Sequence, residues 1–349
     1  MKASEAGIPR VSVVCAWYNR ADYLTDTMES LLAQTFTDYE IILINDGSTD
    51  PRVRRLLQGY AVDSRVLVHS IQNSGFVKAI SYGVSLARAP IIAIQGAGDV
   101  SFPERLAKQY KLLKSDARLA GVICHVRSRT IGEGNDGSSH VINDQPDRFY
   151  HSDLMQRRNF ITHGEMMFRK DIYDRVGGYR VPFTFAQDRD LWLRMSQHGD
   201  FATCPEVLYE RRIFENGGVA ADLPKIMSQR ILSAFARDCA RQRQIFGFDW
   251  VDIFGDQAPL FRPRSKLISK RLAVYSLACL LNNDIQGCKL FSKMSRNECL
   301  TPYSLLAQAV VLGASHSSMC KSIFRLMLSR TSIAPIDCPA ALKNLISRK

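Results

Sequence analysis

The sequence predicts an α/β protein built on a doubly wound, mostly parallel sheet. Three short apolar runs, at residues 11–16, 41–44 and 91–94, are rich in β-branched residues and are bounded by turn-forming residues. Stretches with helical spacing separate these runs, which gives the order β-α-β-α-β of such a sheet. Because the carboxyl ends of neighbouring parallel strands meet along one edge, polar residues that follow the three runs are expected to lie close together.

The elements around these strands follow from local patterns. Residues 22–35 carry apolar side chains at helical spacing and predict the first crossover helix. The turn and cap residues at 46–51 open a second helix that runs through Leu57. Further patterns predict a strand at 66–70, a helix at 75–87, a helix at 103–114, a strand at 121–129 and, where Gly, Asp, Asn and Ser are frequent, a mobile loop at 131–150.

Composition limits the class of protein. The chain has 349 residues, of which 46% are hydrophobic, enough for one large domain plus an extension. Nine scattered cysteines form no CxxC pair and no His/Cys cluster, which favours reduced thiols over a disulfide framework or a zinc site. Residues 1–10 lack the apolar segment of a signal peptide, and the longest apolar stretches, 272–281 and 305–314, are shorter than the roughly 18–20 residues of a membrane helix. We therefore expect a cytoplasmic protein that is soluble or lies peripherally on the inner membrane surface.

The net charge of +12 is confined to the C-terminal part of the chain. Residues 1–224 hold 27 basic and 27 acidic residues, whereas residues 225–349 hold 19 basic and only 7 acidic ones. The basic part is either a soluble helical module that is rich in Lys and Arg, or a surface attracted to anionic phospholipid or a phosphate-bearing acceptor. A nucleic-acid partner is not expected, because no helix-turn-helix, RRM or zinc-finger pattern accompanies the charge. Helical patterns in this part cover residues 223–246, 266–281, 285–294, 302–312, 319–328 and 340–346.

Polar residues follow each of the three predicted strands. Tyr18 and Asn19 come after the first strand, Asp46 after the second and Asp99 after the third. A carboxylate at the edge of such a sheet can accept hydrogen bonds from a base or a ribose hydroxyl, and ligands bind at this edge in doubly wound folds. These residues therefore predict a nucleotide or nucleotide-sugar site.

Five motifs occur in a fixed order along the chain. They are VSVVCAWYNR at 11–20, INDGSTD at 44–50, NSG at 73–75, DVSFPERL at 99–106 and DRDLWLR at 188–194. In this order, over roughly residues 9–220, the chain resembles family 2 of the GT-A-fold glycosyltransferases. The resemblance implies a GT-A catalytic domain at 1–224 followed by a basic, all-α extension at 225–349. It also implies an inverting transfer of a sugar from a nucleoside-diphosphate sugar to an acceptor hydroxyl, in the synthesis of a cell-surface polysaccharide or glycolipid.

The resemblance assigns donor contacts to the first loops. Ala16, Tyr18 and Asn19 would hold the base, although the family usually has Pro at the position of Ala16. Asp46 would accept hydrogen bonds from the nucleoside, with capping of the helix that starts at residue 48 as its alternative role. Lys78 would neutralise a donor phosphate, or else belong to a solvated helix face. A UDP-sugar is the donor expected.

The metal-binding pattern of the family is depleted in this chain. Where relatives have a motif close to Asp-x-Asp-Asp, this chain has Gly, Ala, Gly and then Asp99, so Asp99 alone would hold Mg²⁺ or Mn²⁺ with the diphosphate. Its alternative role is to cap the helix near residue 103. Phe214 stands where many relatives have a metal-binding His. Arg211 or Arg212 could instead supply positive charge to the diphosphate, or form a structural salt bridge.

The acceptor side is expected around the DRDLWLR motif. Asp188 matches the catalytic base of the family, which must reach the attacking hydroxyl, and Gln187 replaces the Glu that relatives have beside it. Capping of the following helix is the alternative role of Asp188, while Asp190 is expected to be structural. His163 is expected in a loop near donor or acceptor, or else as a structural residue.

Two other classes of protein fit the pattern less well. The depleted metal motif would also suit a catalytically impaired protein that binds nucleotide sugars or acts as a scaffold. A nucleotidyltransferase shares the sheet, but it would have a Gly-rich basic loop after the first strand, and residues 15–20 contain none.

Overall fold

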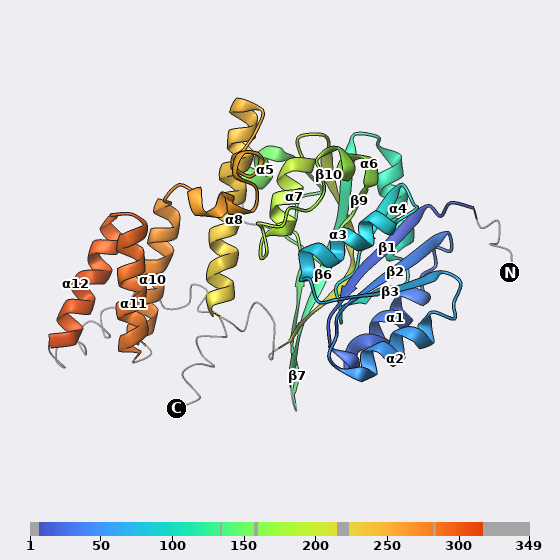
Figure 1. Ribbon diagram of the computed structural model, residues 1–349, viewed down its shortest axis with the longest axis horizontal. Helices are drawn as coiled ribbons and strands as arrows, with labels where there is room; N and C mark the ends of the chain where they lie inside the picture. The colour runs from blue at the N-terminus through green and yellow to red at the C-terminus, as the bar shows by residue number, and fades with distance from the viewer. Residues whose placement is uncertain (1–6, 133–134, 157–159, 215–222, 282–283, 317–349) are drawn as a thin grey trace. The chain divides into compact units, whose positions relative to one another are not determined.

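A computed structural model describes residues 7–132, 135–156, 160–214, 223–281 and 284–316 (Figure 1). The chain divides into two compact units, residues 1–214 and residues 215–349. The first unit contains every strand of the described chain, and the second is helical within the residues described.

Four strands form the parallel half of the sheet. They are β1 (Val11–Trp17), β2 (Tyr39–Asp46), β3 (Val66–Ile71) and β4 (Ile91–Ile94), and they lie in the order β3-β2-β1-β4. All pairings among them are parallel. β1, β2 and β4 are buried along their whole length, as parallel strands covered on both faces should be. The α/β class and the three strands predicted first are therefore confirmed.

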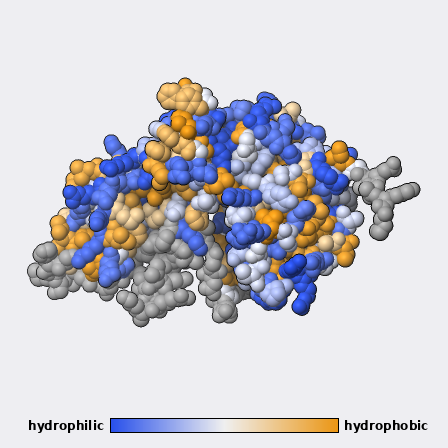
Figure 2. Space-filling view, viewed as in Figure 1, coloured by the Kyte–Doolittle hydropathy of each residue, from blue (hydrophilic) through white to orange (hydrophobic). Residues whose placement is uncertain are grey.

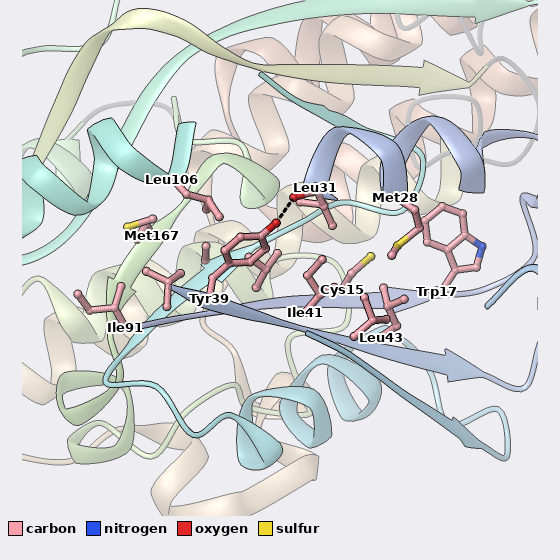
Figure 3. Close-up of a cluster of buried hydrophobic side chains, with 14 of the residues drawn as sticks. Cys15, Trp17, Met28, Leu31, Tyr39, Ile41, Leu43, Ile91, Leu106 and Met167 are labelled. Atoms are coloured by element: carbon pink, nitrogen blue, oxygen red, sulfur yellow. Dashed lines mark hydrogen bonds between the residues drawn. The ribbon is translucent and has the colours of Figure 1, made fainter. Parts of the chain in front are cut away.

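Helices cover both faces of this half of the sheet (Figure 1). The turn η1 (Ala21–Tyr23) and the helices α1 (Leu24–Leu32) and α2 (Pro51–Tyr60) pack on one face, and α3 (Phe76–Leu86) packs on the other. Figure 3 shows Met28 and Leu31 of α1 beside side chains of β1 and β2, with the hydroxyl of Tyr39 donating a 2.7 Å hydrogen bond to the carbonyl of Leu31. On the other face, a Cβ at Gly83 of α3 would lie 2.5 Å from Cγ1 of Val14, so helix and sheet are in close contact.

The other half of the sheet is mixed. The short strand β9 (Met167–Arg169) runs antiparallel between β4 and β6 (Leu119–Gly132), while β6 pairs in parallel with β10 (Asp200–Phe214). The edge strand β5 (Val100–Ser101) is antiparallel to β10. The remaining helical segments of this unit are α4 (Arg105–Ser115), α5 (His151–Gln156), η2 (His163–Glu165), α6 (Lys170–Arg175) and α7 (Gln187–Met195).

The mobile loop predicted at residues 131–150 is wrong over most of its length. Strand β7 (Asn135–Ile142) pairs antiparallel with β6, and β8 (Arg148–Phe149) pairs with β10. Composition misled the prediction, because the polar residues of β7 carry no apolar alternation. The backbone of this segment pairs instead with the long protruding strand β6, and such pairing does not depend on an apolar face.

Over residues 223–281 and 284–316, the second unit consists of helices. They are α8 (Leu223–Phe246), α9 (Trp250–Phe254), the turn η4 (Gly255–Phe261), α10 (Lys266–Leu281), α11 (Ile285–Glu298) and α12 (Pro302–His316). The helical prediction for this part is confirmed as far as residue 316, and the helices predicted at 319–328 and 340–346 lie outside the described residues. No helix among the described residues is long and apolar enough to cross a membrane.

Buried serines join α10 to α11. The hydroxyl of Ser269 donates to the carbonyl of Ser295 at 2.9 Å, and the hydroxyl of Ser295 donates back to the carbonyl of Ser269 at 2.8 Å. Ser276 donates in the same way to the carbonyl of Cys288 at 2.7 Å. These paired bonds fix the register of the two helices within an otherwise apolar core.

Candidate functional site

The loop after β1 is tied to the loop after β2 through Asn19. Its Oδ1 accepts hydrogen bonds from the backbone N–H groups of Thr49, at 2.9 Å, and Asp50, at 3.2 Å, while its own N–H donates to Oγ of Ser48 at 2.9 Å. Asn19 has φ +55°, a conformation that Asn tolerates better than most residues. Tyr18 is 46% exposed beside this loop. The two loops therefore form one connected edge of the site.

Asp46 ends β2 and holds the loop that precedes α3. Its Oδ1 accepts the N–H of Ser74 at 2.7 Å, and its Oδ2 accepts the N–H of Gly75 at 3.0 Å. The alternative role of Asp46, capping of the helix after residue 48, is wrong, because Asp50 caps α2 through the N–H of Arg52. Lys78 lies exposed in the first turn of α3, close along the chain to the segment that Asp46 holds.

Asp99 is surrounded by protein hydrogen-bond donors. The hydroxyl of Tyr209 donates to its Oδ2 at 2.6 Å, and the backbone N–H of Arg212 donates to its Oδ1 at 2.8 Å. Burial raises the pKa of Asp99, although these two bonds and the charges of Arg211 and Arg20 oppose that rise. Asp99 does not cap α4, which begins after Glu104 without a side-chain cap.

The carboxylates and imidazoles near Asp99 do not fit a metal site that the protein builds by itself. Within the described ranges, no group of three or more His, Cys, Asp or Glu side chains is placed to share an ion. Both oxygens of Asp99 already accept hydrogen bonds from protein groups, and Phe214 has no atom that can ligate. Among the described residues, Asp99 is therefore the one carboxylate available, and an ion here would depend on diphosphate oxygens and water for its remaining ligands.

Arg212 directs its guanidinium group towards two carboxylates. It forms ion pairs with Asp26 at 2.7 Å and with Glu210 at 3.2 Å. These contacts correspond to the structural salt bridge that the sequence left open for this residue. The positive charges that act on Asp99 are those of Arg211 and Arg20.

A buried arginine that the sequence analysis gave no role organises the centre of the unit. Arg105 is fully buried, donates to the carbonyl oxygens of Ile94 and Gly164 at 2.8 Å, and lies 4.7 Å from the ring centre of Tyr209. Burial lowers its pKa, while the nearby Tyr209 and acidic groups act against that decrease. The hydroxyl of Tyr209 also accepts the N–H of Gly96 at 3.0 Å. Arg105 and Tyr209 thus position the strand end that carries Asp99.

His163 lies in η2, in an aromatic cluster. It hydrogen bonds to the hydroxyl of Tyr179 at 2.7 Å, and its ring centre lies 5.3 Å from that of Phe76 and 6.2 Å from that of Trp192. Burial lowers the pKa of His163 to about 4, so the ring is neutral at physiological pH. Phe76 directly follows Gly75, which Asp46 holds, and this contact connects His163 to the donor side.

Helix α7 presents two aspartates in different environments. Asp190 is 1% exposed and forms ion pairs with Arg194 at 2.6 Å and with Arg180, which is the structural role expected for it. Asp188 is only partly buried in the first turn, and its charge contributes to the raised pKa of Tyr179, whose main cause is burial. Beside it, Oε1 of Gln187 is buried and has no hydrogen-bond partner within the described chain.

The predicted site residues are linked by a series of contacts. Asp46 holds Gly75, the adjacent Phe76 contacts His163, and His163 bonds to Tyr179. Asp188 is not in this series of contacts, but its charge helps to raise the pKa of Tyr179. On the other side, Arg20 donates to the carbonyl of Ala97 at 2.8 Å and so joins the loop after β1 to the segment that carries Asp99. The residues predicted for the donor and for the acceptor therefore belong to one region of the first unit.

A family model and two known proteins are similar to this chain. Residues 12–177 match the model of glycosyl transferase family 2. The chain is 28% identical to the O-antigen biosynthesis glycosyltransferase WbnJ of Escherichia coli, covering 57% of this chain and 75% of that protein. It is 30% identical to the putative glycosyltransferase EpsE of Bacillus subtilis, covering 55% of this chain and 68% of that protein.

Solved structures share the fold at low sequence identity. The crystal structure of S. aureus TarS 1–349 in complex with UDP superposes with a TM-score of 0.54 at 13% identity, covering 86% of this chain and 90% of that chain. That of GalNAc-T7 with UDP, GalNAc and Mn²⁺ superposes with a TM-score of 0.51 at 15% identity, covering 68% of this chain and 51% of that chain. These structures show the fold alone. The family model and the 30% identical relative confirm the resemblance first seen in the five motifs: the chain belongs to glycosyl transferase family 2.

Proposed function

We propose that this chain is an inverting glycosyltransferase that moves a sugar from a nucleoside-diphosphate sugar to an acceptor hydroxyl. The observation that supports the proposal is the set of contacts that joins the loops after β1, β2 and β4, with Asp46 and Asp99, to His163 and Tyr179, near enough to Asp188 for its charge to act on Tyr179. UDP is the first nucleotide to test, because the TarS and GalNAc-T7 structures contain it. The O-antigen role of WbnJ supports a place in surface-polysaccharide or glycolipid synthesis.

The donor would bind along the loops after β1, β2 and β4. The exposed ring of Tyr18 is available to stack on a base. Asp46 already accepts three hydrogen bonds from Ser74 and Gly75, which leaves one lone pair, on Oδ2, that could accept a base N–H or a ribose hydroxyl. Ala16 and Asn19 would shape the base contact through the first loop. Lys78 is exposed on α3, where it would meet a phosphate.

Asp188 would act as the general base. The acceptor oxygen forms a bond to the anomeric carbon as the bond from that carbon to the diphosphate oxygen breaks. The proton of the acceptor hydroxyl passes to the carboxylate of Asp188, and the nucleoside diphosphate leaves with the electron pair. The Oε1 of Gln187, which is buried without a hydrogen-bond partner, would accept a hydrogen bond from another hydroxyl of the acceptor. This bond would remove the free-energy cost of leaving a buried oxygen unpaired.

A panel of nucleotide sugars with saccharide and lipid-linked acceptors, followed by mass spectrometry of the products, tests this proposal. We expect a glycosylated acceptor of inverted anomeric configuration, and its loss in D188N. Binding of the donor without transfer or hydrolysis, with and without Mn²⁺, would instead identify a nucleotide-sugar-binding or scaffold protein.

We further propose that the catalytic domain spans residues 1–224 and that the basic extension, 225–349, holds the enzyme at the inner, cytoplasmic face of an anionic membrane. Besides its charge, this part exposes large apolar side chains where α8 ends, among them Phe246 at 60% and Phe248 at 49% exposure. Figure 2 shows this apolar projection in orange. Aromatic side chains beside basic ones are typical of a surface that lies on a membrane.

Vesicle sedimentation tests the membrane proposal. We expect binding to vesicles that contain anionic lipid and none to neutral vesicles, with weaker binding when F246S and F248S are combined. V62S, at a position 89% exposed in the first unit, is the matched control and should bind like the unaltered protein. Equal indifference to both vesicle types would refute the proposal.

A further inference from the structure

Three residues lie against the ring of Phe214, near Asp99. The guanidinium carbon of Arg20 lies 4.3 Å from its ring centre, and the ring centre of Tyr23 lies 4.6 Å from it. Gly98 faces the same ring closely enough that a Cβ there would clash with it. Gly98 and Phe214 are the places where this chain has lost a carboxylate and a His of the family pattern, so the two losses lie side by side.

Phe214 closes the space that a side chain at residue 98 would need. A Cβ on Gly98 would lie 2.7 Å from Cζ of Phe214, and Gly98 has φ +95°, which L side chains rarely adopt. A side chain at this position would therefore require the ring of Phe214 to move. The changes at 98 and 214 are sterically coupled, whereas the other missing carboxylate, at Gly96, is a separate loss, because a Cβ there would meet Oδ2 of Asp99.

The positively charged guanidinium group of Arg20 is held in place beside Gly98 and Phe214. Arg20 donates to the carbonyl of Ala97 at 2.8 Å, and the face of its guanidinium group rests on Phe214. Its charge acts on Asp99, and it forms no ion pair with a carboxylate anywhere in the described ranges. The backbone of Arg20 is itself fixed in a left-handed conformation, at φ +57°. A guanidinium held in this way keeps free N–H groups for a phosphate.

We infer that Arg20 contacts the diphosphate of the donor and compensates its charge as it departs, in place of a metal ion held by protein carboxylates. The inference rests on the proposed function, since it needs a nucleoside diphosphate at this edge. Guanidinium matches phosphate oxygens in bidentate geometry, and the flat contact with Phe214 orients it before the ligand arrives. Asp99 then serves to hold the strand end, through its hydrogen bonds from Tyr209 and Arg212, instead of ligating an ion.

Isothermal titration with UDP, GDP, CDP and dTDP tests this inference without requiring activity. In the unaltered protein, the affinity for the preferred diphosphate should change by less than about twofold between EDTA and Mn²⁺. R20Q should lower that affinity roughly 10- to 100-fold, the size expected for a lost charge-assisted contact, and should change the affinity for the corresponding nucleoside by less than about twofold.

R65Q is the matched control. Arg65 also lies over an aromatic ring, 5.2 Å from the ring centre of Tyr39, and donates to a tyrosine hydroxyl, but at the far end of β2. R65Q should leave diphosphate affinity unchanged, and thermal melting shows whether each variant is folded.

Two results would overturn the inference, and a third would overturn the proposed function on which it rests. A loss of diphosphate affinity of more than about twofold on metal removal would show that an ion takes part in binding. An R20Q variant that binds the diphosphate within about tenfold of the unaltered protein would exclude the role of Arg20. If none of the four diphosphates binds, with or without Mn²⁺, the proposed function itself fails. The comparison of EDTA with Mn²⁺ uses only the unaltered protein, so it can overturn the inference even if R20Q does not fold.

Discussion

Replacement of Asp190 by Asn should strongly destabilise the first unit. Asp190 is 1% exposed, and its Oδ2 accepts hydrogen bonds from Nη2 of Arg194 at 2.6 Å and from Nε of Arg180 at 3.1 Å. Loss of one partner of a buried ion pair costs about 3–5 kcal/mol. Arg194 keeps the carbonyl oxygens of Val176 and Gly178 as acceptors, so we expect the lower end, about 3 kcal/mol. For a unit of this size, that loss corresponds to a decrease in Tm of roughly 6–12 °C.

Urea and thermal unfolding followed by circular dichroism measure this effect, with D174N as the control. Asp174 forms a single ion pair with Lys170 at 2.8 Å, and its side chain is 55% exposed, so its loss should cost no more than about 0.5 kcal/mol. Burial would raise the pKa of Asp190, but the ion pairs with Arg194 and Arg180 outweigh it and hold the pKa below its ordinary value. The stabilisation is therefore present at neutral pH and is lost as the pH falls through that lowered pKa. A decrease of less than about 1 kcal/mol at pH 7 would refute this account of the cluster.

Three further changes have defined outcomes. D188N should reduce turnover about 10²- to 10⁴-fold in steady-state assays while leaving diphosphate affinity within about twofold; unchanged turnover would exclude Asp188 as the base. Burial raises the pKa of Glu165 to about 8 in the folded protein, whereas in the unfolded protein the group loses its proton near pH 4.5. The free energy of unfolding of the unaltered protein should therefore fall as the pH rises, by up to about 1.4 kcal/mol per pH unit between about pH 4.5 and 8. E165Q should abolish this fall. Parallel urea-unfolding curves for the two proteins across that range would contradict this. G83A should cost about 1–3 kcal/mol in the same measurement, because its Cβ would lie 2.5 Å from Val14; no loss would mean that α3 shifts freely on the sheet.

The sequence was sufficient for the parallel half of the sheet because its signals are local. The runs that became β1, β2 and β4 are buried on both faces and are therefore almost continuously apolar and rich in Val and Ile. The polar residues at their carboxyl ends, Asn19, Asp46 and Asp99, follow from chain order alone. The exact partners of these residues did not follow, because Asp46 bonds to a loop that begins more than twenty residues later.

The other half of the sheet could not be derived in this way. β9 has only three residues and is inserted antiparallel between β4 and β6, which depends on pairing with strands far along the chain. β7 is polar, so its composition favoured a loop. Arg105 stood within a recognised motif, yet nothing in the motif indicates that its side chain is fully buried and bonds to backbone carbonyls of two distant segments.

The difference between local sequence signals and contacts that form only in the fold also applies to the altered metal motif. In the sequence, the Gly at 98 and the Phe at 214 are two separate losses, and each alone weakens the case for an enzyme. In the fold they touch, and the ring of Phe214 that excludes a side chain at Gly98 also supports the guanidinium of Arg20. A protein that had merely lost catalysis would not need the ring of Phe214 both to fill the space beside Gly98 and to orient the guanidinium group of Arg20. The coupled replacement therefore favours retained donor chemistry with a different source of positive charge.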